Sequence, residues 1–213
     1  GVESVGRLYL CRIPWRRLPV GVFVDADQGI SAARRVMSEL PVLAVDRTGR
    51  DRTWRVTLER RDRGLVLGRG LTTRELGLEY FAKRNTGSGG RQMPSHYSNR
   101  KLNIWSVPTP TGSQLLPACV MAWSMQLDGK KSLVVTTVGD AATRQGDFYE
   151  AISFAIERKL PVLLVVEDNA YGISSPTRKI NPLALGVLPK DQWLQVDGGK
   201  VDEVHNVAIE AFE

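Results

Sequence analysis

The sequence predicts an α/β domain in which a mostly parallel sheet is flanked by helices. Two apolar, β-branched runs, residues 133–138 and 162–166, have the composition of buried strands. Between them, apolar residues recur at the spacing of one helix face, at Phe148, Ala151, Ile152, Ala155 and Ile156. A strand, a crossover helix and a second strand make a right-handed βαβ unit with parallel strands. The middle of the chain therefore indicates the fold class.

Residues 1–59 contain few regular patterns. Short apolar runs at 20–24 and 41–45 and a weak alternation at 54–58 are consistent with strands, and residues 25–37 are consistent with a helix. No motif in this segment carries chemistry. We describe it as a divergent, arginine-rich N-terminal segment of uncertain fold.

The α/β domain is predicted to span residues 60–213. Thr72 and Glu75 have the spacing of a capping box, and the helix that follows is expected to turn Leu76, Tyr80 and Phe81 inward.

Two loops are predicted after this helix. Residues 85–90 (NTGSGG) indicate a flexible loop, and residues 89–113, which have no clear periodicity, indicate an ordered loop over a site. We expect His96, within the second loop, to bond to the loop backbone.

The remaining elements follow from apolar spacing. An apolar helix is predicted at 115–127, a short strand at 193–196 and an amphipathic helix at 201–212. One face of the last helix is predicted to carry Val204, Val207, Ala208 and Ala211.

Two polar residues stand where the strands of the βαβ unit end, Asp140 after the first and Asn169 after the second. Neighbouring parallel strands end at the same edge, where open α/β sheets bind ligands. Carboxylate and amide oxygens suit Mg²⁺ or Ca²⁺ when phosphate supplies the other ligands, and small residues after Asp140 allow a diphosphate to approach the backbone. The alternative is that both side chains only cap turns.

The net charge of +6 lies in the front third of the chain. Residues 1–70 hold 14 arginines, 8 acidic residues and no lysine, whereas residues 71–213 are balanced. The acids are interleaved with the arginines and no aromatic stacking pattern accompanies them, so a solvated or partner-facing surface is favoured over nucleic-acid binding.

No apolar run has the length of a membrane span. The two cysteines are too few for a disulfide framework and indicate reduced thiols in an intracellular protein.

Two blocks of sequence resemble a known family. GDAATRQGDFYEA at 139–151, followed by LPVLLVVEDNAYGISSPT at 160–177, resembles the thiamine diphosphate motif, in which Gly-Asp-Gly is followed later in the chain by Asn-Asn. GRQMPSHYSNRKLNIWSVPTPTGSQLLPA at 90–118 resembles the alpha subunit of the 2-oxo-acid dehydrogenases, and its GRQMP-HY pattern points to the branched-chain type. The match runs from about residue 60 to the end of the chain. The family's usual helical start is not recognisable before it, and relative to the family we expect the chain to be truncated at its C-terminus.

The resemblance implies the diphosphate half of a thiamine diphosphate-binding fold. The residues that it assigns to the cofactor are Arg61, Thr109, Thr111, Gly139, Asp140, Ala141, Ala142, Asn169 and Tyr171. Arg61 takes the place of the family's diphosphate-binding arginine, whose planar fork matches phosphate oxygens. The alternative for Arg61 is a solvated helix face.

The resemblance also implies bound metal ions. Asp140, Asn169 and the backbone oxygen of Tyr171 would hold Mg²⁺, and Ser113 and Gln114 would hold K⁺. Ser113 is alternatively a plain N-cap of the helix at 115–127.

The reaction implied is the oxidative decarboxylation of a branched-chain 2-oxo acid, with transfer of the acyl unit to a lipoyl group. No catalytic residue is expected in this chain, because the family carries its catalytic glutamate on the beta subunit. The partners implied are a beta-type subunit, as two alpha and two beta chains, a lipoyl-bearing acyltransferase and the 2-oxo acid. We expect neither nucleic acid nor a membrane as a partner. The expected location is the cytoplasm, or the mitochondrial matrix in a eukaryote.

Two other classes of function stay open. One is a non-catalytic diphosphate-binding relative or fragment that serves assembly. The other is a basic nucleic-acid-binding α/β protein. Titration with thiamine diphosphate, with and without Mg²⁺, separates the diphosphate-binding classes from the third.

Overall fold

The computed structural model describes residues 7–13, 18–20, 54–57, 62–130, 132–182, 185–188 and 193–212. The predicted helix at 25–37, the predicted strand at 41–45 and Arg61 lie outside these residues. The strand predicted at 20–24 is described only at its first residue.

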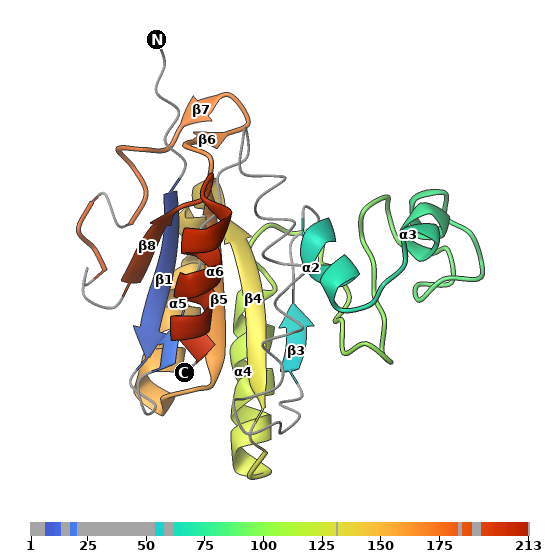
Figure 1. The fold of residues 1–213 in the computed structure, drawn as a ribbon, viewed down its shortest axis with the longest axis horizontal. Coiled ribbons are helices and arrows are strands. Elements are labelled where there is room, and N and C mark those ends of the chain that lie inside the picture. Colours follow the sequence, from blue (N-terminus) through green and yellow to red (C-terminus); the bar gives the residue numbers. More distant parts are fainter. Residues whose placement is uncertain are drawn as a thin grey trace.

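A six-stranded sheet lies at the centre of the molecule (Figure 1). β4 (Leu133–Gly139) and β5 (Val162–Asp168) are parallel neighbours, joined by the crossover helix α5 (Gly146–Arg158). β3 (Trp54–Thr57) pairs with the other edge of β4, also in parallel. The predicted βαβ unit and the predicted strand at 54–58 are therefore confirmed.

An antiparallel strand that the sequence analysis did not predict adjoins the parallel strands. β1 (Arg7–Ile13) pairs in antiparallel fashion with β2 (Leu18–Val20), β5 and β8 (Trp193–Asp197). The α/β class holds, but the pairing is mixed: β3, β4 and β5 are parallel, and each pairing of β1 is antiparallel. The front segment thus contributes strands to the same sheet as the rest of the chain.

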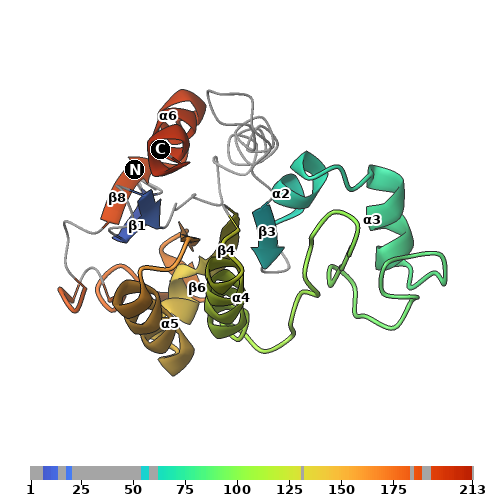
Figure 2. The same ribbon diagram turned by 90° about the horizontal axis from the view of Figure 1, so that it is seen from below.

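Helices cover both faces of the sheet (Figure 2). α4 (Leu115–Leu127) and α5 lie on one face, and α6 (Val201–Phe212) lies on the other. The apolar face predicted for α6 is confirmed, because Val204, Ala208 and Ala211 are buried. Phe148 of α5 stacks on Trp193 of β8, with 6.3 Å between ring centroids. No described helix is both long and apolar enough to cross a membrane.

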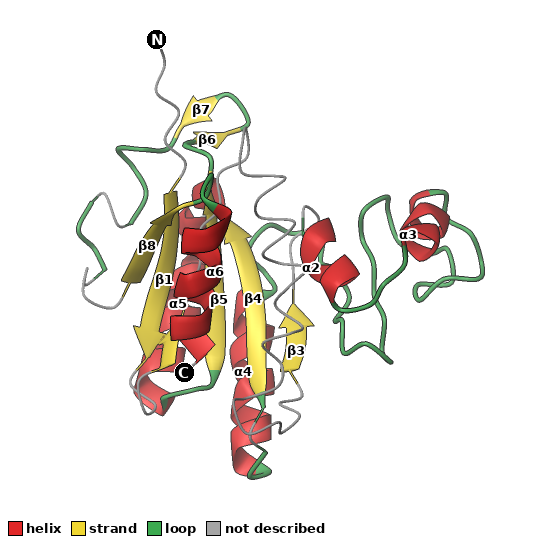
Figure 3. Cartoon of the chain, viewed as in Figure 1, coloured by secondary structure: helices red, strands yellow, loops and turns green. Residues whose placement is uncertain are grey.

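The shorter elements lie around the sheet (Figure 3). α2 (Arg63–Gly68) and α3 (Thr73–Tyr80) extend to one side, beyond β3. The 3₁₀ helix η2 (Asp140–Arg144) follows β4, and the strands β6 (Tyr171–Gly172) and β7 (Ser175–Pro176) form a small hairpin after β5.

The loop between α3 and α4 is ordered by internal contacts. Asn99 and Ile104 form an isolated antiparallel bridge, and Tyr97 is almost fully buried. His96 is also buried, and its Nδ1 lies 3.0 Å from the Pro94 carbonyl oxygen. The prediction that His96 bonds to the loop backbone is confirmed.

The predicted inner face of α3 is only partly right. Leu76 packs against the core, but Tyr80 is 53% exposed and Phe81 is 72% exposed. Glu79 is buried instead, and its carboxylate accepts hydrogen bonds from the amide and the hydroxyl of Ser88, at 3.1 and 2.5 Å. Because α3 extends away from the sheet, part of its surface contacts the following loop rather than the core, and a polar residue can face that loop.

The predicted capping box of α3 is present, because the Thr72 hydroxyl accepts from the Glu75 amide and the Thr72 amide donates to the Glu75 carboxylate. We expect Thr72→Ala to destabilise α3 by about 1 kcal/mol, since one helix amide loses its partner. Amide hydrogen exchange of α3 measures this loss. Thr73→Ala, the same change at the exposed neighbouring position, is the control, and equal exchange in the two variants would contradict the assignment.

Candidate functional site

Two buried carboxylates meet at the carboxyl edge of the parallel strands. The register pairs Gly139 with Glu167, so Asp140 and Asp168 leave β4 and β5 side by side. Asp140 is 3% exposed and Asp168 is 5% exposed. The hairpin of β6 and β7 lies at the same end of the sheet (Figure 1). The sequence analysis predicted this convergence for Asp140 and Asn169 but did not single out Asp168.

The two carboxylates are held by neighbouring donors. The Thr177 hydroxyl donates to Asp140 Oδ2, and the Ala170 amide donates to Asp168 Oδ1 at 2.7 Å. The Asp140 and Asp168 carboxyls are close enough that each shifts the pKa of the other. Two buried carboxylates this close repel each other, so a nearby cation or a proton on one of them is favourable.

Burial is the main cause of a raised pKa at both residues. Loss of hydration raises the pKa of Asp168 to about 6; the Ala170 amide acts against this rise, and the nearby Asp140 carboxylate adds to it. Burial also raises the pKa of Asp140, while the Thr177 hydroxyl lowers it. The pair is therefore poorly suited to carrying two negative charges without a compensating cation.

Asn169 makes a local turn in this structure. Its side chain is half-buried, and Oδ1 accepts a hydrogen bond from the Tyr171 amide at 2.9 Å. This bond of Asn169 fits the alternative in which Asp140 and Asn169 only cap turns. It does not account for two carboxylates buried against each other.

Close packing joins η2 to the hairpin at the same edge. A methyl group added at Gly172 would lie 2.6 Å from Cβ of Ala141. Ala141 is absent from the residues with positive φ, so its methyl group causes no backbone strain. The backbones of the two segments therefore approach closely because residue 172 is glycine.

The segment 109–114 lies beside η2. A Cβ at Gly112 would lie 3.5 Å from Cγ of Gln145, and Gln114 Nε2 donates to the Thr137 carbonyl oxygen at 2.6 Å. Thr109 and Thr111 are exposed. This segment therefore packs against Gln145 and β4, and its role in lining a cofactor stays a prediction.

Ser113 does not cap α4. Its hydroxyl donates to the Pro110 carbonyl oxygen at 2.9 Å, and the N-cap residue of α4 is Gln114. The N-cap alternative for Ser113 is wrong, because the local turn after Pro110 already uses its hydroxyl.

Asp62 anchors the chain next to Arg61. Asp62 is 4% exposed and receives a hydrogen bond from the Thr137 hydroxyl of β4. Residue 62 directly precedes α2, so this contact ties the start of α2 to the strand that carries Asp140. Sequence reasoning missed this role of Asp62, as it missed Asp168 and Thr177. Only Asp168 had a local signal, since it stands beside Asn169 where the motif has a second asparagine.

The donors at this edge fit a divalent cation bound together with phosphate oxygens. The described residues contain no group of three or more His, Cys, Asp or Glu side chains that could hold a metal ion. Two carboxylates and the amide of Asn169 are nevertheless hard oxygen donors, and Mg²⁺ commonly takes one or two carboxylates plus phosphate and water. A cation would also offset the negative charge of the two buried carboxylates.

A parallel βαβ unit with carboxylates at its carboxyl edge is typical of α/β proteins that bind ligands there. Comparison with known protein families identifies the family to which this chain belongs. Residues 47–212 match the family described as dehydrogenase E1 component, and the chain belongs to this family. The match begins before residue 60, where the sequence analysis placed it, and so includes part of the front segment.

Three curated relatives show which members of this family the chain resembles. The chain is 38% identical over 161 residues to the 2-oxoisovalerate dehydrogenase subunit alpha of Bacillus subtilis (strain 168), covering 72% of this chain and 48% of that protein. It is 38% identical over 117 residues to the mitochondrial 2-oxoisovalerate dehydrogenase subunit alpha 2 of Arabidopsis thaliana, covering 55% and 25%. It is 35% identical over 122 residues to the pyruvate dehydrogenase E1 component subunit alpha of Bacillus cereus, covering 57% and 31%.

The predicted resemblance to alpha subunits of 2-oxo-acid dehydrogenases is confirmed by these comparisons. The chain spans between a quarter and a half of the length of these three relatives.

The raised carboxyl pKa values predict a stability that falls as the pH rises. A carboxyl with a raised pKa in the folded state contributes full stability below its unfolded pKa, about 3.9. That contribution is lost as the pH rises through about 6. In metal-free buffer we expect the free energy of unfolding by urea to be greater at pH 5 than at pH 8 by roughly 1–3 kcal/mol. Asp168→Asn should flatten this dependence, whereas Glu150→Gln, an exposed carboxylate on α5, should leave it unchanged.

The contact between Ala141 and Gly172 predicts a coupled pair. Gly172→Ala places two methyl carbons too close together and should destabilise the protein by about 1–3 kcal/mol. Adding Ala141→Gly removes one of those methyl groups and should restore most of the loss. Urea unfolding of the two single variants and the double variant measures this coupling. Additive losses would show that the two residues are not in contact.

Proposed function

We propose that this chain forms the diphosphate-binding half of a thiamine diphosphate-dependent 2-oxo-acid dehydrogenase, as its alpha subunit. The observation that carries the proposal is the buried carboxylate of Asp140, beside Asn169 at the carboxyl edge of the parallel strands. Membership of the E1 family supports it. Relatives named as 2-oxoisovalerate dehydrogenase alpha subunits favour a branched-chain 2-oxo acid as the substrate.

Mg²⁺ would be held by Asp140, Asn169 and the backbone oxygen of Tyr171. In taking this role, Asn169 Oδ1 gives up or shares its hydrogen bond with the Tyr171 amide. The Thr177 hydroxyl keeps the Asp140 carboxylate oriented toward the edge. A cation bound there would offset the negative charges that burial makes unfavourable on Asp140 and Asp168.

Arg61 and the backbone amides of Gly139, Asp140, Ala141 and Ala142 would contact the diphosphate. The bond from Thr137 to Asp62 supports this role for Arg61, because it holds the residue next to Arg61 against β4. The small side chains of Ala141 and Ala142 suit the close approach of a diphosphate to these backbone amides.

The segment 109–114 would line the remaining part of the site. Thr109 and Thr111 are exposed and so remain accessible to the cofactor. Ser113 and Gln114 would bind K⁺ through their oxygens, while Gln114 Nε2 stays on the Thr137 carbonyl. When bound, thiamine diphosphate supplies the electron sink for loss of CO₂ from a 2-oxo acid.

A beta-type subunit would supply the catalytic glutamate, in an assembly of two alpha and two beta chains. The outer face of α4 supports a protein partner. This helix contains no charged residue, and Val120 is 53% exposed and Leu127 is 71% exposed. Exposed apolar side chains on an uncharged helix are typical of a surface that another chain covers. A lipoyl-bearing acyltransferase would accept the acyl unit, and the location would be the cytoplasm or the mitochondrial matrix.

A second candidate is a non-catalytic diphosphate-binding relative or fragment that serves assembly. Asp168 favours this candidate, because it adds a negative charge where the motif has an amide and so opposes an anionic cofactor.

Reconstitution distinguishes the two candidates. The full chain is co-expressed with the beta subunit of a 2-oxoisovalerate dehydrogenase, and the purified complex is assayed for reduction of an artificial electron acceptor. Reduction that requires both chains, thiamine diphosphate and a branched-chain 2-oxo acid supports the enzyme. A stable complex that binds the cofactor without turnover supports the assembly role.

Two matched substitutions test the metal site. Asp140→Asn should abolish Mg²⁺-dependent binding of thiamine diphosphate, because the metal loses its charged ligand. Asp168→Asn, the same change at the adjoining carboxylate, should keep or strengthen binding, because it removes a like charge near the diphosphate. Isothermal titration calorimetry with and without Mg²⁺ measures both effects. If Asp168→Asn alone lost binding, Asp168 rather than Asp140 would be the charged metal ligand.

Asn169→Ala should weaken cofactor binding less than Asp140→Asn. The amide brings no formal charge, so we expect a loss of about 1–3 kcal/mol, the usual cost of removing one polar partner. The same calorimetric titration measures it. A larger loss than in Asp140→Asn would show that the amide is the main ligand.

A further inference from the structure

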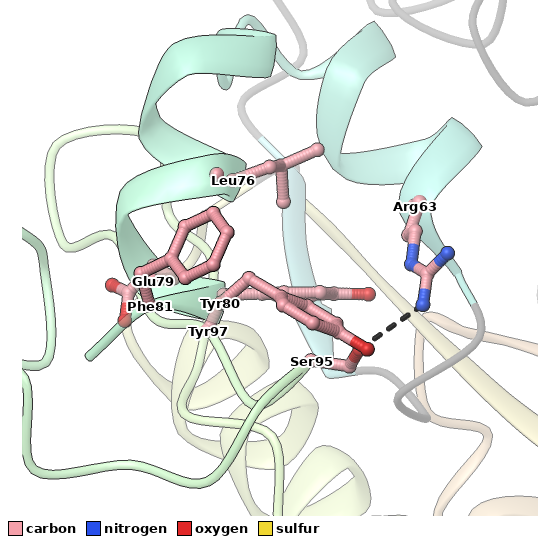
Figure 4. A pocket seen from close by; sticks show the side chains of 8 residues that line it. Arg63, Leu76, Glu79, Tyr80, Phe81, Ser95 and Tyr97 are labelled. Atoms are coloured by element: carbon pink, nitrogen blue, oxygen red, sulfur yellow. Dashed lines mark hydrogen bonds between the residues drawn. The ribbon is translucent and has the colours of Figure 1, made fainter.

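A cavity of about 310 Å³ lies between α2, α3 and the loop that follows Pro94 (Figure 4). Figures 1 and 2 both place α3 beyond α2, on the side away from β4 and β5. The cavity therefore lies on the α2–α3 side of the carboxyl edge, although Tyr97 in its lining is close enough to Glu167 of β5 for the two to interact electrostatically. Its volume is at the lower end of the range for small-molecule sites.

Apolar and aromatic side chains form most of the cavity wall. They are Leu76, Tyr80, Phe81 and Tyr97. Tyr80 and Phe81 are 53% and 72% exposed, and their rings meet edge to face with centroids 6.2 Å apart. Large aromatic rings that border a cavity offer apolar contact area to a ligand, because they lose little conformational freedom on binding.

One cation completes the lining. Arg63 Nη2 donates to the Ser95 hydroxyl at 3.1 Å. Among the ion pairs formed by the described residues, none involves Arg63. A guanidinium group has five N–H donors in a fork that matches a carboxylate, so donors remain available after the bond to Ser95.

The one carboxylate in the lining is already satisfied. Glu79 is buried, and its two oxygens accept the amide and hydroxyl hydrogen bonds of Ser88. In Figure 4, Glu79 and Arg63 lie on opposite sides of the cavity. The charged side chain beside Ser95 is therefore Arg63, while the Asp62 and Glu167 carboxylates act on Tyr97 from outside the lining.

We propose that this cavity binds a small monocarboxylate with an aromatic or branched aliphatic body. The carboxylate would lie on Arg63, and the apolar body would lie against Tyr80, Phe81 and Tyr97. The Arg63 guanidinium would repel a cationic ligand. A diphosphate would leave the aromatic side chains of the wall without an apolar partner. Arg63 is exposed, so its ion pair contributes little and we expect a dissociation constant of about 1 mM.

The test uses the full chain and 3-phenylpropanoate as the probe, with 3-phenylpropanamide as a neutral probe of the same shape. Saturation-transfer NMR titrations should show saturable binding of the acid and about two- to fivefold weaker binding of the amide. Saturating thiamine diphosphate with Mg²⁺ should not displace the acid. The first titration of the acid is made without cofactor, so its result is independent of the proposed enzymatic role.

Arg63→Gln should weaken binding of the acid about two- to fivefold, whereas Arg74→Gln, the same charge change at an exposed position of α3, should leave it unchanged. Phe81→Ala, at an exposed side chain, should weaken the binding of both probes. This variant tests the cavity if Arg63→Gln does not fold. The proposal is overturned if the acid does not saturate, if the amide binds equally well, or if the folded Arg63→Gln or Phe81→Ala variant binds like the wild-type chain.

Discussion

The parallel pairing of β4 with β5 is the constraint on which the candidate site depends. Six residue pairs, from Val134 opposite Val162 to Gly139 opposite Glu167, set the register. A slip of one residue would move every side chain of one strand to the other face of the sheet. Both strands are buried almost throughout, so such a slip would place apolar residues against the wrong helices. This register brings Asp140 and Asp168 to the same edge.

The chemistry of that edge follows from burial. Two carboxylates in water would repel each other weakly, but at 3% and 5% exposure the pair needs a proton or a cation. Thr177, Ala170 and the close approach of Gly172 to Ala141 hold the surrounding backbone in place. A buried pair of carboxylates fits a bound cation, which agrees with the role proposed for this member of the E1 family.

The front of the chain takes part in the same sheet. β1 lies between β5 and β8, and its register places Arg7 opposite both Asp168 and Asp197. β3 extends the parallel strands on the other side of β4. The predicted division into a front segment and a domain from residue 60 stays a prediction, but the strands of the two parts are hydrogen-bonded to each other. The α2–α3 region, by contrast, extends away from the sheet and carries the cavity beside Arg63.

The sequence by itself determined the elements whose signals are local. The βαβ unit, the capping box of α3, the bounds of α4 and the buried face of α6 all follow from spacings within one or a few turns. Tertiary structure alone decided the rest. The bond between Thr137 and Asp62 joins residues 75 positions apart, β1 pairs with strands from the other end of the chain, and Tyr80 and Phe81 are exposed although their spacing suggested a core. Spacing shows which residues share a face, but burial and pairing depend on which distant segment packs against that face.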